Sequence, residues 1–315
     1  MRAVTIHDGA LSVDEHPDPA PGAGQVLVAV KAAGLNGADM LQRKGGYPAP
    51  PGEPQDIPGL ELAGEVVGLG PGAQRFEEGD RVMAVVGGGG QAELAVVHER
   101  AAMPVPEVLD WPRAGGTPEV FVTAHDALFS QAGLRPGERL LVHGAAGGVG
   151  TAAVQLGRAA GAGVTATVRN EALRSRVDEL GATAIDPEGF GEHGPFDVIL
   201  ELVGAPNLAD NLGALAAGGR IVVIGVGVGF KAELNLLAVM GKRATIRGST
   251  LRARPLEEKA AAMRAVEKEV LPLFDRGGID VPVAETFPLE QAEAAYDRFA
   301  EGGKLGKIVI TLGDA

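Results

Sequence analysis

Two patterns of hydrophobic and polar residues follow one another along this 315-residue chain. Up to about residue 115, short apolar runs such as 25–30, 64–67 and 80–86 alternate with clusters of proline and glycine. Runs of β-branched residues bounded by turn residues are typical of strands. Many short strands joined by turns predict a compact, barrel-like β domain.

After Pro118 the pattern changes to short apolar strands that alternate with helices of ten to twenty residues. Such an alternation, with buried strands rich in valine and isoleucine, predicts an α/β fold with a doubly wound parallel sheet of six strands. The expected strands are 139–143, 164–168, 183–185, 197–202, 220–224 and 245–247. The expected helices are 148–160, 171–180, 207–216, 234–240 and 255–274.

The last segment returns to strands around a short helix at 289–299 and ends in the apolar run 307–310. Because this pattern matches the first part of the chain better than the sheet part, we expect the chain to close back onto the β domain. The predicted domains are therefore 1–115, 116–280, and a return to the first domain at 281–315.

A glycine-rich turn follows the first strand of the predicted sheet and opens a helix, which is the context of a dinucleotide-binding fingerprint. A Cβ atom at Gly147 or Gly148 would hold a pyrophosphate away from the positive helix N-terminus, and Gly150 would let the helix pack close to the strand. The spacing departs from the usual fingerprint, so a purely structural turn is the alternative. The expected nucleotide contacts here are Ala146, Gly147, Gly148, Val149 and Gly150.

The end of the second sheet strand decides which nucleotide is favoured. NAD sites carry a carboxylate there for the ribose 2′-hydroxyl, whereas this chain has Arg169, with Arg174 following in the next helix. A guanidinium suits a 2′-phosphate, so the sequence favours NADPH. The alternative is a solvated arginine at a strand end.

Composition and charge narrow the function classes. The chain has no cysteine, which excludes disulfides, thiolate metal ligands and cysteine nucleophiles. Its net charge of −13 disfavours nucleic acid and anionic membrane surfaces as partners. No positively charged start precedes an apolar stretch, so we expect a cytoplasmic protein.

The segments 33–39, 58–66 and 89–93, together with the glycine turn, resemble the medium-chain dehydrogenase/reductase superfamily from the first strand to the last. Segments 42–48 and 248–254 make the chain most similar to its zinc-independent quinone oxidoreductases of the zeta-crystallin type. This resemblance implies a GroES-like first domain and a Rossmann second domain. It also implies a homodimer in which the last sheet strand pairs across a two-fold axis.

Zinc-dependent relatives carry a cysteine and a histidine at the positions of Asn36 and Leu60. Neither residue here is a plausible zinc ligand, so the resemblance implies no metal and disfavours alcohol oxidation. Without zinc, Asp39 and Glu61 are expected to hold turns or to pair with arginines.

The resemblance also nominates residues around the reacting groups. Asn36 and Tyr47 would line the cleft between the domains where the nicotinamide meets the substrate, with catalytic roles for both and a cofactor contact for Asn36. Alternatively, Asn36 only satisfies a turn and Tyr47 only packs on a loop. The remaining expected cofactor contacts are Thr123, Val203, Ile224, Gly225 and Val226.

Three functions stay open from the sequence. The first is NADPH-dependent, metal-free reduction of quinones by hydride transfer. The second is reduction of the C=C bond of alkenals, enones or enoyl thioesters with the same nucleotide. The third is a nucleotide-binding structural or RNA-binding protein of the crystallin type. His143 is expected to be a buried, neutral, hydrogen-bonded imidazole, and neither it nor His125 is given a catalytic role.

Overall fold

The computed structural model describes residues 1–313. The chain divides into two compact units. The first, here called the β unit, comprises Met1–Val122, Leu251–Gly303 and the chain from Lys307 onward. The second, here called the α/β unit, comprises Thr123–Thr250 and Lys304–Gly306.

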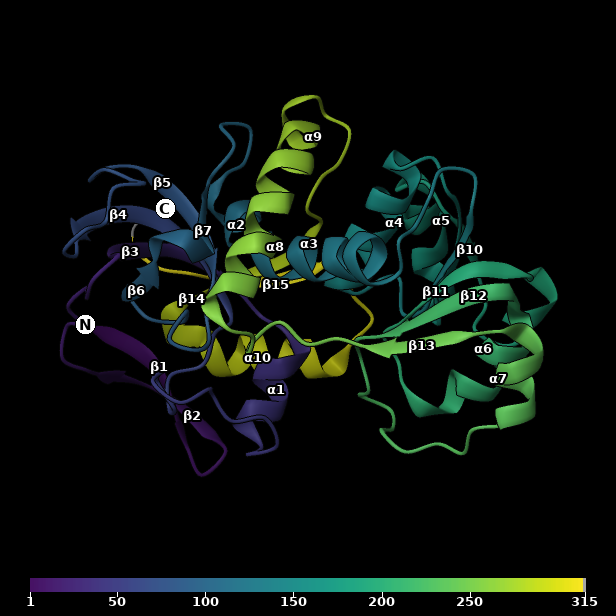
Figure 1. The fold of residues 1–315 in the computed structure, drawn as a ribbon. Helices are drawn as coiled ribbons and strands as arrows, with labels where there is room; N and C mark the ends of the chain where they lie inside the picture. The colour runs from purple at the N-terminus through teal and green to yellow at the C-terminus, as the bar shows by residue number, and fades with distance from the viewer. Residues whose placement is uncertain (314–315) are drawn as a thin grey trace. The chain divides into compact units, whose positions relative to one another are not determined.

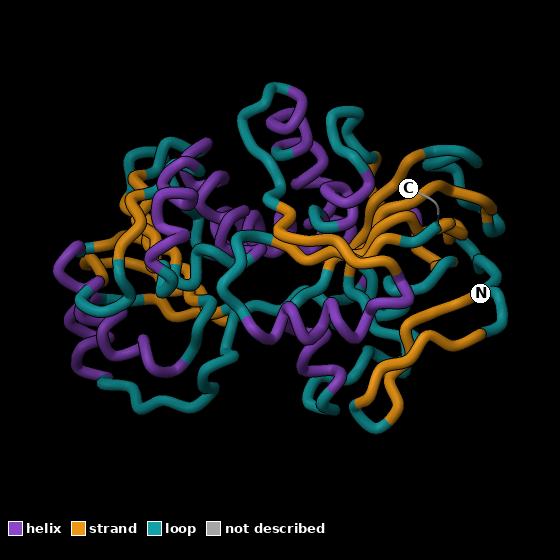
Figure 2. Tube along the Cα trace, turned by 180° about the vertical axis from the view of Figure 1, so that it is seen from behind, coloured by secondary structure: helices purple, strands orange, loops and turns teal. Residues whose placement is uncertain are grey.

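The β unit is built around a seven-stranded sheet in the order β14-β15-β3-β4-β5-β7, with β6 also pairing with β3. Alternate residues of β3 are buried, as expected for a strand with one face on the core. The strands are β3 (Gln25–Gly34), β4 (Glu61–Leu69), β5 (Arg81–Val85), β6 (Leu94–His98), β7 (Ala102–Pro104), β14 (Val283–Pro288) and β15 (Lys307–Thr311). A separate hairpin of β1 (Arg2–His7) and β2 (Ala10–Glu15) lies at the N-terminus (Figure 2).

The end of the chain pairs with a strand from its first part. Strand β15 pairs antiparallel with β3, and Val309 lies opposite Gly34. The helices of this unit are α1 (Gly37–Arg43), α2 (Trp111–Gly115), α8 (Leu256–Glu269), α9 (Leu271–Asp275) and α10 (Ala292–Glu301), and α3 (Pro118–His125) contains the division between the units.

The α/β unit contains the predicted parallel sheet of six strands, in the order β10-β9-β8-β11-β12-β13. Helices α4 and α5 cover one face of this sheet, and α6 and α7 cover the other (Figure 1). The strands are β8 (Arg139–Val142), β9 (Gly163–Thr167), β10 (Thr183–Ile185), β11 (Phe196–Glu201), β12 (Leu215–Val223) and β13 (Thr245–Gly248). The helices are α4 (Gly148–Ala159), α5 (Arg174–Glu179), α6 (Leu208–Ala214) and α7 (Leu236–Lys242).

The strand order reverses between β8 and β11, because the chain builds outward from β8 in one direction and then crosses to β11. In open α/β sheets, ligands bind outside the carboxyl ends of the strands at such a switch point. The turns after β8, β9 and β11 are therefore the first place to look for a nucleotide site.

The structure differs from the expected elements mainly at one long helix. The expected helix 255–274 is two helices, α8 and α9, separated at Val270, with Pro272 in the first turn of α9. Both belong to the β unit, where α8 packs beside β7 and the Arg264 guanidinium donates to the Ala102 carbonyl oxygen. The chain passes from the β unit to the α/β unit after Val122 and returns after Thr250, whereas the sequence places these limits at 115/116 and 280/281.

Candidate functional site

In the β unit, Asn36 lies two residues after the end of β3 and is the N-cap residue of α1. Its side chain is nearly buried, at 8% exposure. The Asn36 Nδ2 atom donates to the Gly34 carbonyl oxygen at 3.2 Å and to Glu61 Oε1 at 2.9 Å. Its Oδ1 atom accepts from Lys307 Nζ at 2.8 Å. The amide is thus held by contacts at both ends within its own unit.

Lys307, the first residue of β15, completes this cluster. Its ammonium lies 2.6 Å from Glu61 Oε1 and donates to the Leu35 carbonyl oxygen at 2.6 Å. With the bond to Asn36, all three ammonium donors have an acceptor. Glu61 Oε2 in turn accepts from the backbone N–H of Glu119 at 2.9 Å. A buried ion pair is tolerated when its remaining donors and acceptors are satisfied, as they are here.

The donor set around Asn36 does not fit a zinc ion. Leu60 is apolar and buried, and the oxygen atoms of Asn36 and Glu61 that face the cluster accept hydrogen bonds from the Lys307 ammonium. Within residues 1–313, no three His, Cys, Asp or Glu side chains are grouped as metal ligands would be. A lysine side chain therefore supplies the local positive charge at this position.

Asp39 holds two turns of this region, as expected from the sequence. Its Oδ2 atom accepts from the backbone N–H of Asn36 at 2.8 Å, and its Oδ1 atom accepts from that of Gly59 at 3.1 Å. Complete burial raises the pKa of Asp39 to about 7, against the lowering effect of these two bonds and of the Lys307 charge. Glu61, by contrast, pairs with a lysine rather than an arginine.

Tyr47 lies under a second buried cation. Arg252 is 2% exposed, and its guanidinium carbon lies 5.1 Å from the centre of the Tyr47 ring. This guanidinium donates to the carbonyl oxygens of Tyr47 at 2.8 Å and Gly87 at 2.7 Å, and to Gln42 Oε1 at 2.6 Å. Arg252 thus fixes the loop that carries Tyr47. Partial burial raises the pKa of the Tyr47 phenol above its ordinary value, which already leaves the hydroxyl protonated at neutral pH.

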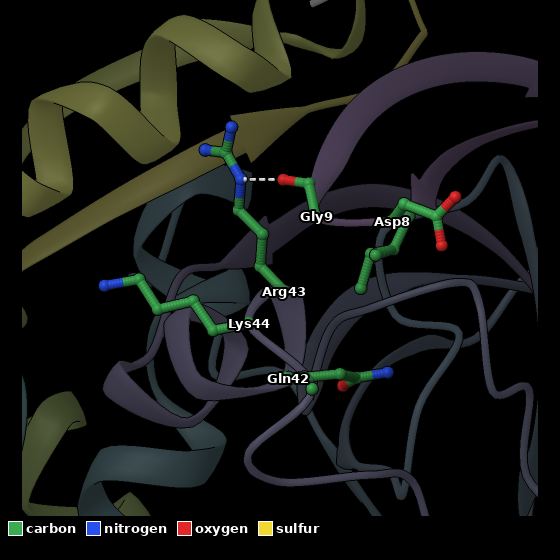
Figure 3. Close-up of a pocket in the computed structure, with 7 residues that line it drawn as sticks. Asp8, Gly9, Gln42, Arg43 and Lys44 are labelled. Atoms are coloured by element: carbon green, nitrogen blue, oxygen red, sulfur yellow. Dashed lines mark hydrogen bonds between the residues drawn. The ribbon is translucent and has the colours of Figure 1, made fainter.

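A separate cavity of about 700 Å³ in the β unit lies between the β1–β2 turn and the end of α1. Its charged side chains diverge: Lys44 and Asp8 point in different directions, and Arg43 donates to the Gly9 carbonyl oxygen at 2.7 Å (Figure 3). Arg43 also lies 3.3 Å from Glu293. None of the residues predicted for the site lines this cavity, so we do not assign the candidate site to it.

In the α/β unit, the glycine turn has the geometry that the sequence predicts. Gly144 has a φ of +60°, which favours glycine. A Cβ atom at Gly150 would lie 2.6 Å from the Ala145 Cα atom, so this glycine permits the close approach of α4 to the turn. The turn is closed by hydrogen bonds from Gly147 N to Gly144 O at 3.0 Å and from Gly306 N to Ala146 O at 2.8 Å.

This turn suits an anionic diphosphate. Helix α4 has twelve residues and begins at Gly148, after the N-cap residue Gly147, and no side chain caps its first turn. Its first backbone N–H groups lie at the positive end of the helix dipole, where a phosphate is stabilised. The observed arrangement of strand, turn and helix therefore fits the binding of a dinucleotide.

The two predicted arginines have different surroundings. Arg169 is exposed after β9, and no carboxylate among residues 1–313 lies in ion-pair distance of it. Arg174 donates from Nε to the Val168 carbonyl oxygen at 3.1 Å and pairs with Asp186. Arg169 is thus the more available of the two for a ligand phosphate.

The structure brings together the predicted contacts that follow β11 and β12. Val228 N donates to the Val203 carbonyl oxygen at 3.0 Å, and a Cβ atom at Gly225 would lie 2.3 Å from the Leu202 carbonyl oxygen. Val226 is 44% exposed, and Thr123 in α3 is 9% exposed. Asn36 and Tyr47 belong to the other unit.

Sequence reasoning missed three residues of these regions: Lys307, Arg252 and Glu201. Lys307 carried a usable signal, because a lysine beside the run Ile308–Ile310 at the start of a core strand needs a buried partner. Arg252 and Glu201 carried no such signal in the sequence, because the side chains that bind them come from other segments of the chain.

Two family models match parts of the chain, and the second match includes residues of both units. Residues 22–107 match the family described as Alcohol dehydrogenase GroES-like domain. Residues 177–310 match the family described as Zinc-binding dehydrogenase.

Among curated proteins, the chain is 33% identical to a quinone oxidoreductase of Rattus norvegicus over 93% of this chain and 91% of that protein. It is also 33% identical to a quinone oxidoreductase of Homo sapiens, with the same coverage. A third similarity, at 36% identity over 92% of this chain, is to 13% of the spectinabilin polyketide synthase system protein NorB of Streptomyces orinoci.

Among solved structures, the chain is similar to an NAD-dependent alcohol dehydrogenase with a TM-score of 0.88 and 28% identity, over 99% of this chain and 100% of the other. An alcohol dehydrogenase superfamily protein from Novosphingobium aromaticivorans gives a TM-score of 0.87 at 30% identity, with 99% of both chains covered. Within residues 1–313, none of the helices has the length and apolar character needed to span a bilayer.

Proposed function

This chain belongs to the medium-chain dehydrogenase/reductase superfamily, whose oxidoreductases bind a nicotinamide cofactor, and from that premise we propose that it is an NADPH-dependent quinone reductase that works without a metal ion. The observation that supports the proposal is the buried Lys307–Glu61–Asn36 cluster, in which the Lys307 ammonium is bound by oxygen atoms of both other side chains. A cytoplasmic location stays a prediction.

The choice of quinones is supported by the relatives. Proteins named quinone oxidoreductase align with this chain over nearly its whole length. Quinones are already electron-poor, so their reduction depends less on a Lewis acid than does the oxidation of an alcohol. Neutral hydrogen-bond donors and a positively charged neighbourhood are enough to stabilise the developing oxyanion.

The choice of NADPH rests on Arg169. Its exposed guanidinium stands at the end of β9, where a dinucleotide fold places the group that reads the ribose 2′ position. In the proposed reaction NADPH supplies a hydride, and the quinone takes that hydride and one proton to become a hydroquinone. The phosphates would be held by the amides of Gly147 to Gly150.

Tyr47 is the proposed hydrogen-bond donor to the quinone oxygen. Its hydroxyl is protonated at neutral pH, as an ordinary phenol is, and burial raises its pKa further. Changing Tyr47→Phe should lower kcat by about tenfold or more, since general acid catalysis contributes roughly two orders of magnitude or more. The matched control is Tyr296→Phe, whose phenol is buried in the core of the same unit against Gln91. An unchanged kcat/KM in Tyr47→Phe would show that the Tyr47 hydroxyl makes no contribution to the transition state and that the ring only shapes the site.

A second candidate reaction is the reduction of the C=C bond of an enone, alkenal or enoyl thioester. The similarity to part of the polyketide synthase system protein NorB favours it. The two reactions share the nucleotide and the hydride step, so the shape of the acceptor distinguishes them. A nucleotide-binding protein of structural or RNA-binding role would instead bind NADPH and reduce neither class.

We also propose that two copies of the chain associate through the β13 edge of the α/β sheet. All four residues of β13 are exposed, and among residues 1–313 this strand pairs only with β12. Large apolar side chains are exposed along the same part of the chain: Val226, Val228, Phe230, Leu234, Leu236, Leu237, Met240 and Ile246. An edge strand beside such a patch suits an isologous interface. Sedimentation of Phe230→Glu against wild type tests the association.

The deciding experiment is an NADPH-oxidation screen with ortho- and para-quinones beside short and long enones, repeated with NADH. Turnover with quinones and a strong preference for NADPH support the proposal. Turnover with enones alone favours the second reaction. Nucleotide binding without any turnover, together with retention of RNA at physiological salt, favours the third.

A further inference from the structure

Below the nucleotide edge of the α/β sheet lies a buried chain of hydrogen bonds that the proposed reaction does not use. His143 directly follows β8, Thr167 ends β9, Glu201 ends β11, and Asn211 belongs to α6. Their exposed fractions are 1%, 2%, 2% and 0%. The imidazole ring also meets the edge of Phe190, with ring centres 4.7 Å apart.

The distances connect the four side chains in series. His143 Nδ1 lies 3.0 Å from Thr167 Oγ1, and His143 Nε2 lies 2.7 Å from Asn211 Oδ1. Asn211 Nδ2 donates to Glu201 Oε2 at 2.8 Å. The other Glu201 oxygen, Oε1, accepts from the backbone N–H groups of Val203 at 2.7 Å and Gly204 at 2.8 Å.

Only one direction of donation satisfies this series. The Glu201 carboxylate accepts, so the Asn211 amide must present its oxygen to His143, and His143 Nε2 must carry the proton. His143 Nδ1 is then an acceptor, and the Thr167 hydroxyl donates a hydrogen bond to it. Burial lowers the pKa of His143, which keeps the imidazole neutral at neutral pH even though Glu201 lies 3.9 Å away.

Three members of the series lie next to turns that carry predicted nucleotide contacts. His143 adjoins the Gly144 turn, Thr167 precedes Arg169 by two residues, and Glu201 binds the amide of Val203. The last turn has little freedom, because Gly204 has a φ of +125° and a Cβ atom there would lie 2.4 Å from the Gly229 carbonyl oxygen.

We propose that the Thr167–His143–Asn211–Glu201 series sets the spacing of the three turns after β8, β9 and β11, so that together they match one nicotinamide dinucleotide. The inference rests on the proposed function, since it assigns these turns to that nucleotide. The four side chains are positioning residues, because the backbone groups and Arg169 beyond them would touch the ligand. A fully satisfied buried network rigidifies its surroundings, and loss of one member frees the others.

The test measures the Kd of NADPH by calorimetry well below the unfolding midpoint, together with hydrogen–deuterium exchange over residues 202–204. Asn211→Ala interrupts the series at its centre and should weaken NADPH binding by about tenfold, with faster exchange of the Val203 and Gly204 amides. Thr167→Val removes one hydroxyl at constant shape and should weaken binding by about threefold. Thr167→Ser keeps the hydroxyl and should bind as wild type does.

Thr165→Val is the matched control, because it makes the same change on the same strand outside the series. It should leave both the Kd and the exchange unchanged. A folded Asn211→Ala protein that has a lower unfolding midpoint but wild-type Kd and exchange would show a merely structural role and overturn the inference. If Asn211→Ala does not fold, a wild-type Kd for NADPH in Thr167→Val would overturn the inference instead. A wild-type protein that binds neither NADPH nor NADH refutes the proposed function itself, and the inference with it.

Discussion

The two regions assigned to the reaction are built from different materials. Around Asn36, buried ionic side chains satisfy one another, with Lys307 Nζ 2.6 Å from Glu61 Oε1. Around Gly147, backbone N–H groups form the surface that would contact a ligand. The close approach of α4 to the turn depends on glycines, because they have no side chain. The first region should therefore lose stability when a buried charge loses its partner. The second should lose stability when a side chain is added.

The largest effect is expected from Lys307→Met, which leaves the Glu61 carboxylate and the Asn36 oxygen buried without their cation. We expect a loss of about 3–5 kcal/mol in the free energy of unfolding, measured by urea denaturation. Adding Glu61→Gln should recover about half of it, because the uncompensated charge is gone.

The exposed pair of Arg100 and Glu257 is the control, because it has the same N–O distance as the buried pair but lies in solvent. It also measures 2.6 Å, but its side chains are 45% and 74% exposed. Arg100→Met should leave the urea midpoint unchanged within error, because solvent screens this pair. Equal losses in Lys307→Met and Arg100→Met would contradict the account of the first region.

The second region is tested by Gly150→Ala. The added Cβ atom would lie 2.6 Å from both the Ala145 Cα atom and the Gly144 carbonyl oxygen, so α4 or the turn must shift. We expect about 3 kcal/mol of destabilisation and a weaker NADPH complex, measured by thermal unfolding and titration. Gly213→Ala, in α6, meets nothing within 4 Å and should be neutral or slightly stabilising. Equal unfolding temperatures and equal NADPH affinities of the two variants would contradict the close approach of α4 to the turn.

Arg169→Ala tests the charge that the proposed function assigns to the 2′-phosphate of NADPH. Loss of a charge-assisted contact to the 2′-phosphate should raise the KM for NADPH by about tenfold to a hundredfold. The KM for NADH should hardly change, and neither should that for NADPH in Arg176→Ala, an exposed arginine of α5. Equal effects of Arg169→Ala on both nucleotides would reject the NADPH assignment.

Asp39 gives the first region a pH signature. Its pKa is about 7 in the folded protein against 3.8 in a free side chain, so the folded state holds a proton that the unfolded state releases. The contribution to stability is therefore present at low pH and is lost as pH rises from about 4 to 7. Relative to Asp39→Asn, wild-type stability should fall by about 1.4 kcal/mol per pH unit between about pH 5 and 7. Parallel pH profiles of the two proteins would contradict the raised pKa.

The elements that carry a local signal were predicted well. The glycine turn, the six parallel strands and the return of β15 to the β domain follow from glycine spacing and strand periodicity. The burial and hydrogen bonding of His143 were also anticipated, because a polar residue at the end of a core strand needs partners.

The partners themselves could not be predicted. Lys307 reaches Glu61 and Asn36 across more than two hundred residues of sequence, and Arg252 reaches Gln42 across a similar span. Such contacts depend on how distant strands are brought together, which periodicity does not report. The break between α8 and α9 was missed for another reason, because apolar residues continue through Val270 and Leu271.

The central claim is that this chain passes a hydride from NADPH to a quinone without a bound metal ion. The most direct test is stopped-flow oxidation of NADPH by a para-quinone, using protein dialysed against a chelator and checked for metal by elemental analysis. The account predicts undiminished single-turnover rates, with no gain on adding Zn²⁺. A rate that disappears with the metal and returns with Zn²⁺ would contradict it.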